Sequence, residues 1–204
     1  MSKTDEGAQS FAKFCHAAGA QKCAFYDKSE RKIMTRVHNI LENMQKDPIP
    51  VSDPNFTVSP RLVTYEEILF IMFMGVYSPA PIFPLVAQLF ADLEHRNGSS
   101  LALALQDGSF DPSALNYGGL IACMDAPGRY NLSTIEKWEA HVKKVNKISK
   151  FGGDAFASVP LLCRAMDIVP PKSQQFFGTP SAKNTSFPIL FVGNTVDPIT
   201  PIAG

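Results

Sequence analysis

The residue of this chain best placed to do chemistry is Asp197, a carboxylate in a short turn that follows an apolar run. The run, residues 187–192, is uninterrupted and rich in β-branched and aromatic side chains, which predicts a strand buried on both faces of a parallel sheet. Pro198 restricts the backbone of Asp197, so the turn is stiff. Sheets of this kind place reacting groups at the carboxyl ends of their strands. Asp197 is therefore a candidate catalytic acid; the alternative is that it only caps a helix starting near Pro201.

The last residues of the chain, NTSFPILFVGNTVDPITPIAG, contain an Asp-Pro-x-Thr-Pro motif. This segment resembles the C-terminal signature of the tripeptidyl-aminopeptidase-like branch of the α/β-hydrolase superfamily. The resemblance implies that Asp197 is the acid of a Ser-Asp-His triad in a serine hydrolase that releases short peptides from protein N-termini. It also implies acyl transfer, with a peptide or small molecule as substrate.

The other two triad groups are not found in these 204 residues. In this superfamily serine, aspartate and histidine follow one another along the chain, so the nucleophile should precede the sequence and the histidine should follow Asp197. No Gly-x-Ser-x-Gly motif occurs, and the four histidines, His16, His38, His95 and His141, all come before Asp197 in helix-like contexts. We therefore expect a fragment that lacks N- and C-terminal parts of the hydrolase domain and is inactive alone.

The fold class that the resemblance implies is a partial α/β hydrolase. Residues 1–117 would form a mostly helical lid, or cap, and residues 118–204 the start of the family's C-terminal domain, with one or two strands of an incomplete sheet. A buried backbone group without a partner costs about 1–3 kcal/mol, so we expect strand 187–192 to fray or aggregate in the isolated chain. Asp125 lacks the Pro-x-Thr-Pro that follows Asp197, and we expect it to be a cap or a solvated group.

Local patterns predict the helices of the lid. Apolar residues recur at helical spacing over residues 29–45. Thr64 and Glu67 match a capping box ahead of a helix that is apolar on every side, which we expect to be core, with pocket lining as the alternative. Ser133 and Glu136 match a second capping box. The other predicted segments are helices at 9–16, 84–96 and 99–106 and an extended, proline-rich linker at 47–61.

The four cysteines are an even number, compatible with two disulfides. Cys15 and Cys23 flank a glycine turn, and the family's lid opens with the same C-x-x-A-G-x-x-x-C pattern, so the resemblance implies that they pair. It also implies a bond between Cys123 and Cys163. A zinc site using Cys15, His16 and Cys23 is the rival interpretation, but its spacing matches no common site and it lacks a fourth ligand.

Charge and hydropathy restrict the partners. The net charge is zero and no basic cluster occurs, which argues against nucleic acid or an anionic membrane surface as the main partner. No apolar run approaches the ~18 residues of a membrane span. No phosphate loop or metal motif occurs, so we expect neither cofactor nor metal.

Several features favour a secreted parent protein. N-glycosylation sequons occur more often than chance predicts, at Asn55, Asn97, Asn131 and Asn184. The paired cysteines point to the same oxidising compartment. The polar N-terminus of this chain carries no signal peptide, so we expect the signal to lie in a missing part.

Two other function classes stay open. One is an esterase-like hydrolase on the same fold, because fold and triad do not determine the substrate. The other is a non-catalytic truncated remnant, or a helical module that binds a partner. Flanking genomic sequence separates the enzyme from the remnant: a Gly-x-Ser-x-Gly upstream and a Gly-His downstream indicate a hydrolase, and stop codons indicate the remnant.

Overall fold

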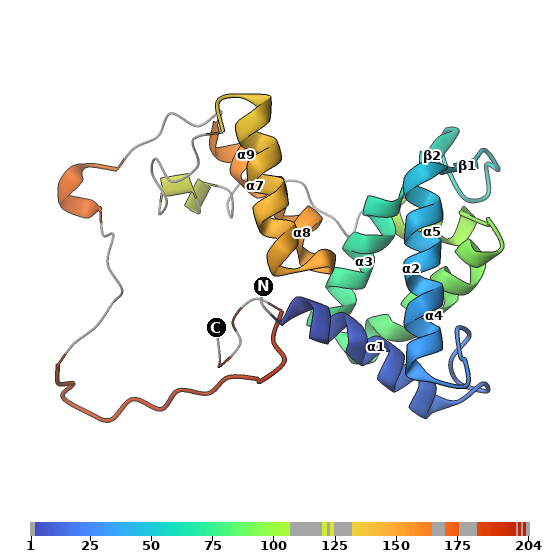
Figure 1. The fold of residues 1–204 in the computed structure, drawn as a ribbon, viewed down its shortest axis with the longest axis horizontal. Coiled ribbons are helices and arrows are strands. Elements are labelled where there is room, and N and C mark those ends of the chain that lie inside the picture. The colour runs from blue at the N-terminus through green and yellow to red at the C-terminus, as the bar shows by residue number, and fades with distance from the viewer. Residues whose placement is uncertain are drawn as a thin grey trace.

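A computed structural model describes residues 3–106, 120–121, 123–124, 132–164, 170–175, 183–198, 200 and 202. The described part is mainly helical (Figure 1). Its elements are α1 (Thr4–Ala18), α2 (Glu30–Lys46), β1 (Ile49–Val51), β2 (Arg61–Val63), α3 (Tyr65–Tyr77), α4 (Pro79–Glu94), α5 (Ser99–Gln106), α7 (Ile135–Ile148), α8 (Lys150–Ala157), α9 (Val159–Arg164) and the 3-10 turn η1 (Lys172–Gln174). None of these helices is both long and apolar enough to cross a membrane.

Three of the described helices begin at a residue whose side chain caps the free backbone amides of the first turn. Ser29 caps α2 by accepting from the Lys32 amide, and the predicted capping box of Thr64 and Glu67 is present at the start of α3. The second predicted box is wrong by one residue, because the N-cap of α7 is Thr134, which accepts from the Lys137 amide.

The fourth helix is longer than predicted. It begins at Pro79 rather than at Pro84. The first turn of a helix has no acceptors for its own amides, so a proline there loses no hydrogen bond and has the helical φ already. Pro84 lies inside the helix and does not start it.

The predicted linker at 47–61 is wrong in part, because its ends form an antiparallel hairpin. Ile49 pairs with Val63 and Val51 with Arg61. The side chains of Ile49, Val51 and Val63 are buried while Pro50 and Leu62 are exposed, so burial alternates along the strands. Pro50 and Leu62 are apolar, so the sequence itself carried no alternation that could predict the hairpin. A Cβ on Gly98 would lie 3.0 Å from the Val51 side chain, so the hairpin packs tightly against the turn between α4 and α5.

The main core lies between α1, α2, α3 and α4. Phe11 of α1 contacts the rings of Phe83 and Phe90 of α4, at centroid distances of 5.4 and 6.0 Å. Phe25, in the loop after α1, contacts Phe90 at 5.5 Å. The apolar helix α3 is largely buried, as expected, although Met74 near its end is exposed.

Helices α1 and α3 cross at very close range at Gly7. A Cβ on Gly7 would lie 2.2 Å from Val76 Cγ1, a distance that only glycine allows. The crossing brings the first turn of α1 to the last turn of α3.

The first turn of α1 also holds α8. Asp5 Oδ1 accepts from Ser149 Oγ at 2.7 Å and from the Phe151 amide at 3.0 Å, and Oδ2 accepts from the Lys150 amide at 3.1 Å. Asp5 therefore satisfies the orphan amides at the start of α8 from another helix. This contact fastens α8 to the α1–α5 core, although the predicted domain boundary at 117/118 lies outside the described residues.

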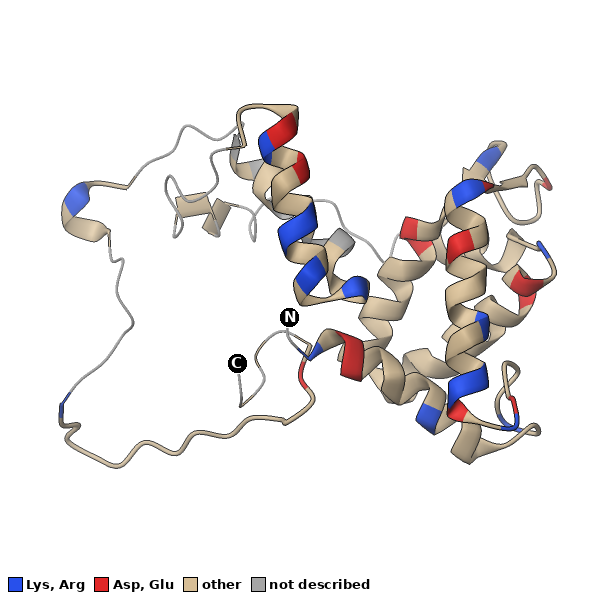
Figure 2. Cartoon of the chain, viewed as in Figure 1, with Lys and Arg blue, Asp and Glu red and all other residues tan. Residues whose placement is uncertain are grey.

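The C-terminal segment departs from the expected strand. Residues 183–198 run in an extended arc, shown red in Figure 1, and in the described part β1 and β2 pair only with each other. Phe187 is 80% exposed and Val192 is 88% exposed. The expectation of a buried strand is therefore wrong for this chain as it stands, because no neighbouring strand covers the run. Figure 2 shows that the arc carries no charge between Lys183 and Asp197.

A partly buried arginine links three elements of the core. Arg36 of α2 donates to both carboxylate oxygens of Glu94 on α4, at 2.8 and 2.6 Å, and to the carbonyls of Phe25 and Tyr26. Its guanidinium also stacks over the Phe25 ring, 3.9 Å from the centroid. The hydrogen bond from Arg36 holds the pKa of Glu94 below its ordinary value.

Replacing Arg36 by lysine keeps the charge and loses the two-pronged geometry, so we expect a loss of about 1–3 kcal/mol in the free energy of unfolding, measured with urea. The control is Lys143→Ala, because the Lys143–Glu139 pair is 4.0 Å apart and exposed, and it should cost less than about 0.5 kcal/mol. The pKa of Glu94 is lower in the folded state than in the unfolded state. The contribution of Glu94 to folding stability is therefore fully present above the pKa of an ordinary carboxyl group, and it is lost as the pH falls through the lowered pKa. Equal costs for the two variants would contradict the role of Arg36.

Hydrogen exchange tests the state of the C-terminal arc. The amides of residues 189–192 should exchange almost unprotected, because they have no strand partner, while those of residues 68–73 in the middle of α3 should be strongly protected. Mass spectrometry of the monomer measures both. Protection of the arc at the level of α3 would mean that a sheet forms after all.

Candidate functional site

The turn that contains Asp197 is fastened to the helical body. Thr4 Oγ1, fully buried in the first turn of α1, donates to the Pro198 carbonyl at 2.8 Å. Pro198 itself is buried and Asp197 is half-buried. The exposed arc therefore ends in an anchored turn beside α1.

One oxygen of the Asp197 carboxylate is fixed by the backbone. Oδ1 accepts from the Thr200 amide at 2.7 Å, a side-chain-to-backbone bond within the turn. The described residues after Asp197 are not helical, so its role as a helix cap stays a prediction. The bond from Thr200 sets the direction of the carboxylate. A carboxylate has several acceptor sites, so a hydrogen bond at Oδ1 is compatible with orienting a histidine.

A tyrosine lies beside this carboxylate. Burial, and then the negative charge of Asp197, raises the pKa of Tyr77, the last residue of α3, above its ordinary value. The Tyr77 ring also packs edge-on against Phe73, at a centroid distance of 5.2 Å. From the sequence, Tyr77 was only the start of a proline-rich turn, and Thr4 only an N-terminal residue. The resemblance extends to the tyrosine-proline turn at Tyr77 but gave that residue no role at the site, so long-range interactions place both residues there.

The four histidines lie in other surroundings. His16 Nδ1 is 3.0 Å from the Asp27 carbonyl and its ring stacks on Tyr26. His38 packs beside Phe151, His141 beside Trp138, and His95 ends α4. These contacts give each histidine a structural setting of its own. The expectation that the triad base comes from sequence outside the 204 residues stays a prediction.

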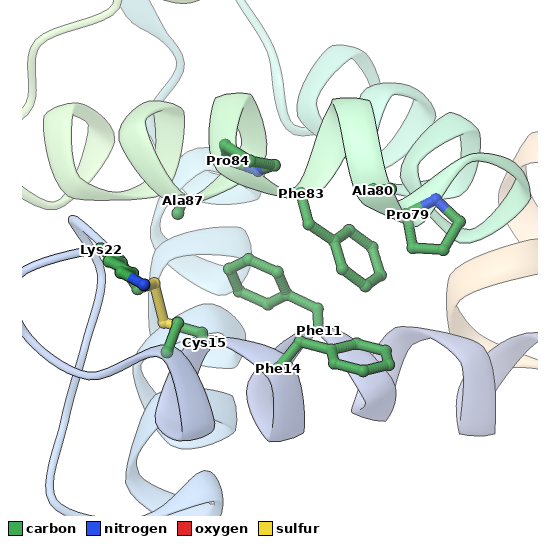
Figure 3. A pocket seen from close by; sticks show the side chains of 11 residues that line it. Phe11, Phe14, Cys15, Lys22, Pro79, Ala80, Phe83, Pro84 and Ala87 are labelled. Atoms are coloured by element: carbon green, nitrogen blue, oxygen red, sulfur yellow. A yellow bond between two sulfur atoms is a disulfide. The ribbon is translucent and has the colours of Figure 1, made fainter.

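Two hollows adjoin the turn. One, of about 540 Å³, is lined by Val196, the neighbour of Asp197, together with Glu6, Lys13 and Glu30. The other, of about 330 Å³, lies between α1 and α4 and is almost entirely apolar (Figure 3). Phe14 and Pro79 line both, so the two hollows are contiguous. The apolar hollow is lined mainly from α1 and α4, and the Met and Phe residues of α3, which the sequence offered as the alternative lining, line neither hollow.

The cysteines are paired in the structure as the resemblance implied. Cys15 bonds Cys23, with an S–S distance of 1.97 Å, and Cys123 bonds Cys163, at 2.07 Å. The first bond removes both thiolates that the rival zinc site would need. In the described ranges no group of three or more His, Cys, Asp or Glu side chains is arranged to hold a metal.

The sequons differ in their surroundings. Asn55 and Asn97 lie in exposed turns, and Asn184 lies in the exposed arc. Asn131 falls outside the described residues, as does Asp125. The three described sequons are therefore accessible.

Comparisons of the chain with protein-family models, with curated proteins and with solved structures gave no match. The resemblance rests on the Asp-Pro-x-Thr-Pro motif and on the cysteine spacing.

The contact between Asp197 and Tyr77 can be tested by titration. Asp197→Asn removes the negative charge and keeps the shape, so we expect the pKa of Tyr77 to fall towards its ordinary value and, because burial remains, to stay above it. NMR titration of labelled tyrosine, assigned with Tyr77→Phe, measures it. The control Asp53→Asn removes a carboxylate from the hairpin loop and should leave Tyr77 unchanged. An unaltered Tyr77 titration in Asp197→Asn would show that the turn is not docked beside α3.

Proposed function

We propose that this chain supplies the helical lid and the triad acid, Asp197, of a secreted α/β-hydrolase that acts as a serine exopeptidase on peptides with a free N-terminus. The observation that carries the proposal is the anchored turn. An acid that orients a histidine must be held still, and here Thr4 binds the Pro198 carbonyl next to Asp197 while the Thr200 amide binds the Asp197 carboxylate.

The role of Asp197 in such an enzyme follows from triad chemistry. A serine attacks the scissile carbonyl, a histidine takes its proton and later returns it to the leaving amine, and the acid holds the histidine in the productive tautomer and stabilises its cationic form. The serine and the histidine would come from polypeptide outside these 204 residues. Asp197 would accept the hydrogen bond from the histidine.

The arc before the turn supports the same assignment. A parallel strand is covered on both faces and paired on both sides, so its sequence is continuously apolar. Residues 187–192 have that composition and are exposed here. They would become the strand that precedes the triad acid when the rest of the sheet is present.

The hollow beside the turn supports a peptide substrate. Its lining includes the carboxylates Glu6 and Glu30 against the single cation Lys13. Glu6 pairs with Lys3, so Glu30 is the carboxylate of the lining that is complementary to the ammonium group of a peptide with a free N-terminus. An esterase-like hydrolase would use the same triad acid without this complementarity.

Two measurements test the proposal. Reading the genomic frame in both directions should reveal a Gly-x-Ser-x-Gly before Met1 and a Gly-His after Gly204. Stop codons on both sides would favour the non-catalytic remnant.

In the gene product that contains those motifs, Asp197→Asn should lower turnover of a tripeptide anilide by up to ~10⁴-fold with little change in melting temperature, because the amide keeps the shape and favours the wrong histidine tautomer. Asp53→Asn, an exposed turn carboxylate, is the matched control and should keep full turnover. A mere cap at position 197 predicts near-normal turnover and a loss of about 1 kcal/mol or less in stability. Near-normal turnover in Asp197→Asn would overturn the assignment. Comparing ester with peptide substrates separates the two hydrolase classes.

A further inference from the structure

The apolar cavity between α1 and α4 has the properties of a small-molecule site. Its volume of about 330 Å³ lies at the lower end of the ~300–1,000 Å³ typical of ligand pockets. Phe11 and Phe14 line it from α1, and Phe83 lines it from α4, where the small residues Ala80 and Ala87 on either side leave room (Figure 3). Apolar walls give water few hydrogen bonds, so an apolar occupant is favoured.

The aromatic side chains of the lining contact one another. Phe83 contacts Phe11 edge-on at 5.4 Å and Phe14 at 6.2 Å. Phe11 is buried while Phe14 is half exposed at the mouth. An alkyl or aromatic group entering the cavity would cover the exposed part of Phe14 and remove apolar surface from water.

One cation stands at the mouth of the cavity. Lys22 is the only charged residue among those that line it, and its side chain is exposed. The ion pairs found in the described part of the chain use other cations, namely Lys3, Arg36, Arg61, Arg96 and Lys143.

The loop that bears Lys22 is held by covalent and hydrogen bonds. Cys23, its neighbour, is bonded to Cys15 on α1, and this disulfide forms part of the cavity lining. The Gly19 carbonyl accepts from the amides of Lys22 and Cys23, at 3.1 and 3.0 Å. The backbone of Lys22 is thus fixed relative to the aromatic side chains of the lining, which reduces the ordering cost of binding.

We propose that this cavity binds a small amphiphile that has an apolar chain or ring and a single carboxylate, with the chain lying along the rings of Phe11, Phe14 and Phe83 and the carboxylate beside the Lys22 ammonium. The assignment rests on the residues that line this cavity and not on the proposed role of Asp197. The proposal predicts that both parts of the ligand contribute to affinity, and that the apolar part contributes more than the carboxylate.

Titration of the full 204-residue chain with decanoate, followed by calorimetry and by NMR shifts, tests the proposal. We expect saturable binding of one decanoate, with shifts at Phe14 and Phe83. Lys22→Ala should weaken decanoate by about 2–5-fold, as for an exposed ion pair, and should leave the uncharged decanol unchanged. Lys28→Ala, an exposed lysine outside the cavity, should leave both unchanged.

A second pair of variants locates the apolar part. Ala80→Phe and Ala80→Trp place a large side chain at an exposed lining position and should weaken both ligands at least ~10-fold, because no room remains for the chain. Leu85→Phe lies on the same helix outside the cavity and should bind normally. Melting temperatures verify that the variants fold. The site would be overturned if decanoate did not bind, or if both Ala80 variants bound normally. The carboxylate assignment would be overturned if Lys22→Ala weakened decanoate and decanol equally.

Discussion

The first turn of α1 is the constraint on which the rest of the structure depends. Thr4 and Asp5 are adjacent in sequence and hold partners that lie almost two hundred and almost one hundred and fifty positions away: the Pro198 carbonyl and the start of α8. Gly7, a few residues on, admits the close crossing of α3. Three separate parts of the chain therefore meet on one helical turn, and the position of the Asp197 carboxylate relative to the core follows from that meeting.

The segment that leads to this turn has an apolar composition but an exposed position. Residues 187–192 have the apolar composition of a strand covered on both faces, yet the described part of the chain offers them no sheet. The hydrophobic effect and the unpaired backbone groups both favour an additional partner for them. The anchored turn after them would keep its position on the helical body while the apolar run engages neighbours, which fits a lid and an acid that belong to a larger hydrolase.

The helical body combines dense packing with an unfilled space. Phe11, Phe83 and Phe90 close the core between α1 and α4, while the small residues Ala80 and Ala87 leave a cavity at its edge. The disulfide beside it fixes the loop that carries a cation to its mouth. The hollow is open to solvent, with Phe14 and Lys22 exposed at its mouth.

The sequence determined those features that depend on neighbours within a few positions. The capping box at Thr64 was predictable from Thr64 and Glu67 alone because its hydrogen bonds join residues three apart, and the amphipathic pattern predicted α2 for the same reason. The motif around Asp197 gave the candidate acid and left its role as cap or catalyst open. Only the tertiary structure placed Thr4 and Tyr77 beside that carboxylate and opened the cavity between α1 and α4, because these depend on contacts between segments far apart in the chain, for which no local pattern exists.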